Sequence, residues 1–170
     1  MNDMNDMNDM DDISDVLRSV SDRWAIHDVI TRYWMHVDRR EWDQVKGCFV
    51  PGALVDYSDL MPIGHAVAAE DVVDRIAQAI EIYSVTVHNV GNHEVVIDGD
   101  TAHSEATIVA HHVYRDPERN EGRLPVAGLR YTDVLVRAGA EWRIRDRKAT
   151  TDWRAWWDPR SPTYVDGRHQ

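Results

Sequence analysis

The carboxylate of Asp38 lies where a side chain can face a pocket. Between Asp11 and Arg40 apolar residues recur at three- and four-residue spacing, the pattern of an amphipathic helix. At 100° per residue, Asp38 falls at the edge of this apolar stripe, one turn beyond Trp34 and close to the predicted helix end. A carboxylate in this place can take part in acid or base chemistry inside an enclosed site.

The nine histidines of the chain suggest either proton transfer or metal binding. His111 and His112 are adjacent in a predicted strand, so they point to opposite faces, and no His-x-x-x-His helix spacing appears at the apparent site. His112 shares the more apolar, inward face with Ala106, Ile108 and Ala110, and a bulge would exchange it for His111. We therefore expect no catalytic metal.

Cys48 is the only cysteine, which excludes an intramolecular disulfide and a C-x-x-C pair. Beside Phe49 it is most simply a core residue, since no basic neighbour marks it as a nucleophile. Glycine-rich phosphate loops, serine-centred elbows and dinucleotide fingerprints are also missing. The sequence favours a reaction without a cofactor.

The elements that must position these groups follow a simple order, with helices first and strands later. The apolar pattern predicts helices over 11–40, 41–49 and 68–83. The alternating pattern predicts strands over 53–57, 85–97, 101–114, 126–136 and 141–148, with an Asp-Gly turn at 98–100 in the first long hairpin. Helices with one apolar face and long antiparallel strands imply an α+β fold, in which a strongly curved, mainly antiparallel sheet wraps three N-terminal helices into a cone with a ligand cavity.

Length and composition fit one globular domain with one core. We expect a disordered tail over 1–10, where Met-Asn-Asp is repeated three times, a domain over 11–158 and a second tail over 159–170. A net charge of −11 disfavours nucleic acid and anionic lipid. The lone cysteine, with no membrane span or secretory signal, favours the cytoplasm.

Several local stretches resemble the SnoaL-like branch of the NTF2-like superfamily, from about Arg23 to Trp153. The stretches that carry the resemblance are Arg32-Tyr33 with Asp38 and the following Arg39-Arg40-Glu41-Trp42-Asp43, His88-Asn89, Asn92-His93 with Ile97-Asp98-Gly99-Asp100-Thr101-Ala102, Arg130-Tyr131-Thr132-Asp133, and Glu141-Trp142-Arg143-Ile144. This resemblance implies the NTF2-like cone.

The resemblance also implies a site. Scytalone dehydratase, bile-acid dehydratase and hexachlorocyclohexane dehydrochlorinase pair a helix-end aspartate with a strand histidine, and Asp38 and His88 match those places. A carboxylate that accepts the imidazole N–H holds the base in one tautomer and stabilises the imidazolium. Tyr33 matches the tyrosine of the bile-acid dehydratase type and is the expected acid. The expected substrate-binding residues are Arg130, His112, His111, Trp34 and Tyr57.

The resulting hypothesis is a cofactor-independent lyase or isomerase for a small cyclic, largely apolar molecule. The alternatives are a non-catalytic binding or accessory protein and a polyketide-type cyclase with Asp38 as acid. Each residue also has a structural interpretation: Asp38 as a helix-end cap, His88 as a satisfied strand histidine, Tyr33 as a packing residue and Arg130 as a rim ion pair.

The end of the chain is rich in tryptophan over 152–159. These side chains would either cover the cavity mouth as a lid or be buried between subunits. Relatives in the resembled family assemble through the outer face of the sheet, so we expect a homo-oligomer, either a dimer or a trimer.

Overall fold

The structure is a computed structural model, and it describes residues 3–158, with side chains from residue 13 onward. Three helices and a short 3-10 turn accompany six strands. In chain order the elements are α1 (Asp3–Arg39), α2 (Trp42–Gly47), β1 (Phe49–Asp56), β2 (Val67–Ala68), α3 (Ala69–Ala79), β3 (Tyr83–Asp98), β4 (Thr101–Tyr114), η1 (Arg119–Gly122), β5 (Leu124–Ala138) and β6 (Glu141–Trp157).

Helix α1 is the longest element and begins at Asp3, earlier than the predicted start at Asp11. Residues 3–10 are therefore helical where the Met-Asn-Asp repeats favoured a tail, because adding residues to a helix that has already formed costs little. The predicted tail over 159–170 lies outside the described residues. At its other end α1 stops at Arg39, and Arg40 adopts a left-handed backbone with φ of 62°.

The six strands form one curved, unclosed sheet in the order β2-β1-β6-β5-β4-β3. Strands β1 and β6 run parallel, whereas the other neighbours are antiparallel. Gly99 and Gly139 have φ of 57° and 69° at the tips of the β3-β4 and β5-β6 hairpins, the positions where the two predicted turns require left-handed backbone. The predicted α+β cone is confirmed.

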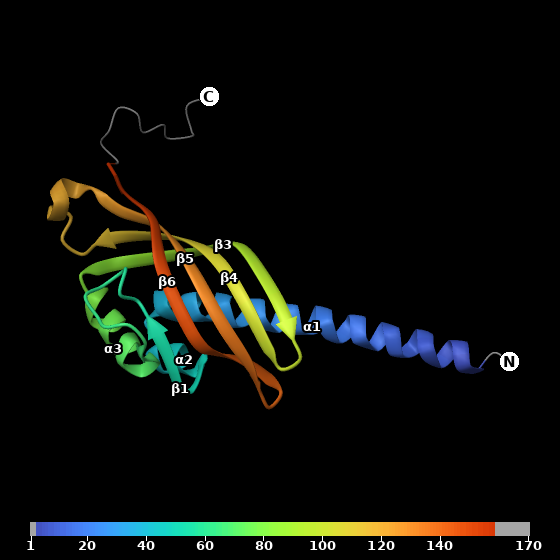
Figure 1. The fold of residues 1–170 in the computed structure, drawn as a ribbon. Coiled ribbons are helices and arrows are strands. Elements are labelled where there is room, and N and C mark those ends of the chain that lie inside the picture. The colour runs from blue at the N-terminus through green and yellow to red at the C-terminus, as the bar shows by residue number, and fades with distance from the viewer. Residues whose placement is uncertain (1–2, 159–170) are drawn as a thin grey trace, which may run out of the picture.

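Helices and sheet pack through the concave face of the sheet, as Figure 1 shows. The inner row of β4 and the facing side of α1 supply much of the core, because every second strand residue and every third or fourth helix residue points inward. The largest fully buried side chains are Trp142, Tyr33, Tyr57, Tyr131, Ile26, Ile30, Ile108, Leu135 and Ile144. This core fixes the end of α1 against β3.

A bulge in β3 sets which side chains of that strand face inward. The register with β4 shifts between Val90 and His93. Gly91 lies in this shift, where a methyl group would collide with Thr107 of β4. Before the bulge even-numbered residues such as Thr86 and His88 face the helices, and after it odd-numbered residues do.

Three element boundaries differ from the sequence prediction. Helix α3 ends at Ala79, so Tyr83 opens β3 and does not close the helix. Strand β1 begins at Phe49, which had been expected in a helix. Strand β6 continues to Trp157 because it stays paired with β5 as far as Leu124. Among the described helices none is long and apolar enough to cross a membrane.

Candidate active site

Asp38 and His88 lie in direct contact, one from the last turn of α1 and the other from β3. The His88 ring Nδ1 lies 2.7 Å from Asp38 Oδ1. The backbone N–H of His88 also donates to Asp38 Oδ2 at 3.0 Å. The pair expected from the sequence is therefore brought together, and the helix end is fastened to the strand at the same point.

Two further residues hold the carboxylate in place. The Thr86 hydroxyl donates to Asp38 Oδ1 at 2.8 Å. The Arg40 guanidinium donates to Thr86 Oγ1 at 2.7 Å and to the carbonyl oxygen of Val37 at 3.0 Å. The left-handed backbone of Arg40 turns the chain at the helix end, where this side chain folds back against β3. Sequence reasoning missed this support, although Thr86 lies two residues before His88 on the same strand face.

The His88 ring is fixed in its plane by aromatic neighbours. Trp34 stacks on it with ring centroids 4.2 Å apart and planes inclined by 18°. His112 meets it edge to face at 5.6 Å. Because Asp38 is a carboxylate, Nδ1 of His88 is the nitrogen that carries the proton, and Nε2 keeps a lone pair. An imidazole held in this way has the orientation that a general base requires.

Burial and neighbouring groups shift the pKa values of Asp38 and His112. Burial raises the pKa of Asp38, but hydrogen bonds and charge from His88 outweigh it, and the net pKa lies below the usual value. Burial, and then the neighbouring His88, lower the pKa of His112 to about 4. At neutral pH Asp38 is therefore ionised and His112 is uncharged, so His112 adds no positive charge beside His88.

A cavity of about 390 Å³ lies beside this pair. His88, His112, Trp34 and Tyr57 all contribute to its wall, which is otherwise mostly apolar. The apolar residues of the wall are Val37, Leu60, Met61, Ile76, Ile80, Ala110, Pro125, Val126, Ala127, Leu129 and Ala155. Trp34 is 4% exposed, and its indole N–H has no hydrogen-bond partner within the described chain. A pocket of this size and lining suits a small organic molecule.

Tyr33 is fully buried and does not line the cavity, so the structure does not support its expected role as the acid. Its hydroxyl lies 3.1 Å from that of Tyr57, which does line the cavity. Tyr33 faces the interior because its place on the apolar stripe of α1 directs it between helix and sheet. Tyr33 is a packing residue under the cavity floor.

A buried ion pair packs against the tyrosine rings beneath the cavity, and it was not predicted from the sequence. The Arg147 guanidinium donates to both oxygens of Asp133, at 2.7 and 2.8 Å. Both side chains are fully buried. The same guanidinium lies 4.3 Å from the Tyr33 ring centroid and 5.0 Å from that of Tyr131. A bidentate pair with cation-π neighbours offsets part of the cost of burying two charges.

The structure contradicts two of the expected substrate-binding residues. Arg130 lies on the outer face of the sheet, where it pairs with Glu105 and Asp152, because Tyr131 takes the inward position of β5. His111 likewise points outward on β4, and no bulge displaces His112 from the inner face. The cavity wall contains His112 and neither of the other two.

The tryptophan-rich segment belongs to β6, whose end forms part of the cavity mouth. Arg154, Ala155 and Trp156 border the opening. Trp153 lies against Gly128 on the neighbouring strand, where a methyl group would overlap its indole ring. The sequence left two interpretations of this segment, a lid over the cavity mouth or an interface between subunits. The position of Trp156 supports the lid. Among the described residues no three His, Cys, Asp or Glu side chains gather as metal ligands.

Comparison with known proteins places this chain in a family. The profile of the SnoaL-like domain family matches residues 18–148, which span both the helix carrying Asp38 and the strand carrying His88. This chain belongs to the SnoaL-like domain family. The SnoaL-like chain is also 30% identical to protein Rv2910c of Mycobacterium tuberculosis (strain ATCC 25618 / H37Rv) over 131 residues, 77% of this chain and 86% of the relative.

Solved structures agree with the SnoaL-like assignment at the level of fold. The Kfla4162 protein of Kribbella flavida superposes with a TM-score of 0.73 at 22% identity, covering 81% of this chain and 95% of that one. A hexachlorocyclohexane dehydrochlorinase, LinA type 2, superposes with a TM-score of 0.70 at 13% identity, covering 88% and 99%. The profile match over residues 18–148 confirms the predicted resemblance to the SnoaL-like branch of the NTF2-like superfamily, and these structures agree with it in fold.

Proposed function

We propose that this SnoaL-like protein is a cofactor-independent lyase or isomerase acting on a small cyclic, largely apolar molecule. The observation that carries the proposal is that His88 lines an apolar cavity while its ring Nδ1 lies 2.7 Å from Asp38 Oδ1 behind the wall. An imidazole whose outer nitrogen faces substrate and whose inner nitrogen is held by a carboxylate is the usual arrangement of a general base.

The proposed step is removal of a proton from a carbon next to a carbonyl or a leaving group. The His88 Nε2 lone pair takes the proton, and Asp38 stabilises the resulting imidazolium. The electrons of the C–H bond then either form a carbon-carbon double bond as the leaving group departs with its electron pair, or delocalise into an enolate. The first outcome is an elimination and the second leads to isomerisation.

Donors for the developing negative charge are available in the same wall. The Trp34 indole, whose N–H has no partner among the described residues, stacks on His88. Tyr57 contributes to the cavity wall, and its hydroxyl lies 3.1 Å from that of Tyr33. A buried N–H without a partner costs about 1–3 kcal/mol, so a substrate oxygen that accepts from it gains affinity. These two groups take the role that Tyr33 and Arg130 were expected to fill.

Hydrogen-deuterium exchange tests the proposal directly. A panel of cyclic ketones is incubated in D₂O with the protein, and loss of carbon-bound protons is followed by NMR together with ligand binding. We expect exchange that falls at least 100-fold in His88→Ala and Asp38→Asn, with binding retained. His65→Ala is the matched control, because His65 pairs with Asp56 and is 81% exposed in its side chain, away from the cavity wall.

Two outcomes would contradict the proposal. Exchange that persists undiminished in His88→Ala would show that His88 is not the base. Tight binding of cavity ligands with no exchange in the parent protein would favour the alternative of a non-catalytic binding or accessory protein.

A further inference from the structure

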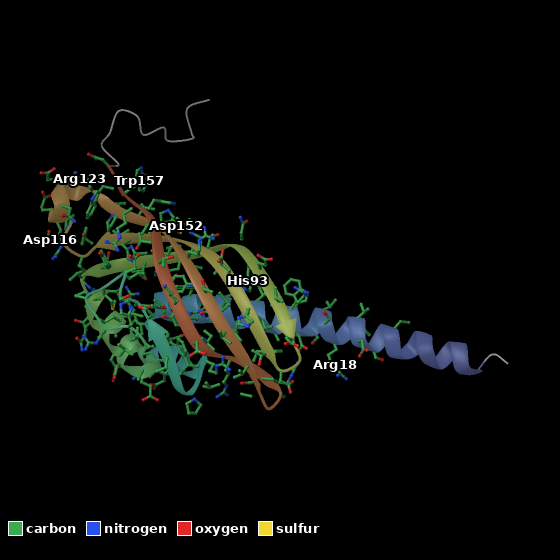
Figure 2. All side chains as sticks on the ribbon, in the orientation of Figure 1. Arg18, His93, Asp116, Arg123, Asp152 and Trp157 are labelled. Carbon is green, nitrogen blue, oxygen red and sulfur yellow. The ribbon has the colours of Figure 1, made fainter. Side chains whose placement is uncertain are left out.

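A row of large apolar side chains on α1 is left uncovered by the rest of the described chain. Its members are between 48% and 65% exposed, and we call this row the α1 stripe; it consists of Ile13, Val16, Leu17, Val20 and Trp24. Figure 1 shows that the N-terminal part of α1 projects beyond the sheet, and Figure 2 places Arg18 close to where this projection begins. Val20 and Trp24 lie beside β3. Exposed apolar patches of this kind mark binding surfaces.

The domain to which α1 belongs cannot cover this stripe, because it already holds the opposite side of the helix. Asp22 accepts hydrogen bonds from Arg137 and from Trp142 of the β5-β6 hairpin. Ile26, one turn later, is fully buried. At 100° per residue Asp22 lies 140° away from Leu17 and 160° away from Trp24 around the helix axis. Ile13, Val16 and Leu17 therefore lie away from these contacts, whereas Val20 and Trp24 border a hollow beside β3.

We infer that the α1 stripe binds the same stripe of a second copy of this chain, with the two helices antiparallel. Ile13, Leu17, Val20 and Trp24 are separated by four, three and four residues, the spacing of a coiled-coil seam. A twofold axis passing between residues 18 and 19 pairs Ile13 with the partner's Trp24 and Leu17 with the partner's Val20. Each large ring thus meets a smaller aliphatic side chain.

Charge favours this occupant over others. Asp15, Arg18 and Asp22 lie outside the seam, whereas Ser14 and Ser21 flank it, so two copies approach without opposing like charges along their contact. The net charge of −11 disfavours an anionic membrane as the partner of the stripe. A projecting helix also gains stability from packing, because most helical stability in proteins comes from burying an apolar face.

A hollow next to the stripe provides room for the partner's side chain. It measures about 320 Å³ and is bordered by Val20, Trp24, His27, His93 and Val95, together with Arg23. The floor of the hollow is a contact between ring nitrogens, with Nδ1 of His27 3.1 Å from Nδ1 of His93. In the proposed dimer, Trp24 and the Ile13 side chain of the second copy would close this hollow to solvent.

Sedimentation of the full-length chain tests the inference. The wild type should be a dimer at micromolar concentration, and Leu17→Glu/Val20→Glu should weaken association at least 100-fold while its circular dichroism and thermal unfolding remain those of a folded domain. Ser19→Glu is the control, because Ser19 is exposed on the same helix outside the seam and should not change the mass. A monomeric wild type, or a double variant with unchanged mass, would overturn the inference; an unchanged oligomer would move the interface elsewhere, for example to the outer sheet face.

Cross-linking tests the orientation of the helices. One chain carries Ile13→Cys and a second, mass-tagged chain carries Trp24→Cys, both with Cys48→Ser. Antiparallel pairing predicts a disulfide between the two different chains on mixing, and none for either chain alone. Disulfides within the Ile13→Cys protein alone would instead indicate parallel helices and contradict the proposed pairing.

Discussion

The hydroxyls of Tyr33 and Tyr57 lie 3.1 Å apart, but only Tyr57 lines the cavity. Replacing Tyr33 by Phe removes a hydrogen bond beneath the cavity floor and leaves the wall unchanged. We expect Tyr33→Phe to lower the free energy of unfolding by about 1 kcal/mol and to change turnover less than threefold. Tyr57→Phe is the matched comparison and should reduce turnover at least tenfold. Urea unfolding and steady-state kinetics on the same preparations measure both effects, and the reverse order of the two turnovers would restore Tyr33 as the acid.

Thr86 supports the pair through its hydroxyl alone, which makes Thr86→Val an informative change. It removes the donor to Asp38 and the acceptor of Arg40 without altering side-chain size. We expect a loss of about 1–3 kcal/mol in unfolding free energy and a tenfold or greater fall in turnover, because the carboxylate loses a fixed hydrogen bond. Thr132→Val, on the exposed outer face of β5, is the control and should change neither quantity. Equal behaviour of the two variants would argue against this support.

The lowered pKa of His112 predicts a dependence of stability on pH. The pKa is about 4 in the folded protein and about 6.5 in the unfolded chain. Between these values the unfolded chain binds more protons, so stability is complete above pH 6.5 and falls as the pH decreases toward 4. Urea unfolding from pH 7.5 to 4.5 should show a smaller decrease in His112→Asn than in the wild type. His111→Asn, on the outer face, should retain the wild-type slope, and a slope unchanged by His112→Asn would contradict the assignment.

The buried pair of Arg147 and Asp133 predicts a large effect on stability. Arg147→Met leaves the Asp133 carboxylate buried without its partner, and we expect a loss of about 3–5 kcal/mol. The double variant Arg147→Met/Asp133→Leu removes both charges and should recover much of that loss. Guanidinium unfolding measures the series. A double variant as unstable as Arg147→Met would show that the loss comes from packing against the tyrosine rings and not from the unpaired charge.

A substitution of Arg130 tests the finding that this residue lies on the outer face of the sheet. Its partners Glu105 and Asp152 are on the outer face, and all three side chains are between 38% and 46% exposed. Exposed ion pairs contribute little to stability, so Arg130→Met should leave turnover unchanged and have little effect on the unfolding free energy. A tenfold loss of turnover in this variant would mean that Arg130 reaches the substrate after all.

Much of the fold could be predicted from local patterns because these patterns follow directly from the geometry of helices and turns. The apolar period of α1 and the Asp98-Gly99 turn report helix and hairpin directly. The direction of Arg130 could not be predicted from alternation because β5 carries a charged residue on its inner face: Asp133 faces inward as the partner of Arg147, and the strand then appears polar on both sides. A long-range ion pair of this kind leaves no local trace in the sequence.

The residues of the candidate site were likewise predicted only in part from the sequence. Resemblance to the family predicted Asp38 and His88, and strand alternation predicted His112. The role of Tyr33 was not predicted correctly, because its spacing among the buried apolar residues of α1 shows only that it faces inward. Whether an inward side chain reaches a cavity depends on its neighbours, here Tyr57. The end of β6 could not be predicted from strand pattern, since residues 152–157 are exposed and show no alternation of buried and exposed positions.

The hydrogen bond from the His88 backbone N–H to Asp38 bears on how this scaffold can change over time. Every amino acid except proline carries that N–H, so the fastening between helix end and strand is inherited whatever side chain occupies position 88. One nucleotide substitution can remove the imidazole and leave the architecture standing. The proposed catalysis is thus separable from folding at this position, which makes the scaffold a suitable starting point for installing a different reactive group by directed evolution.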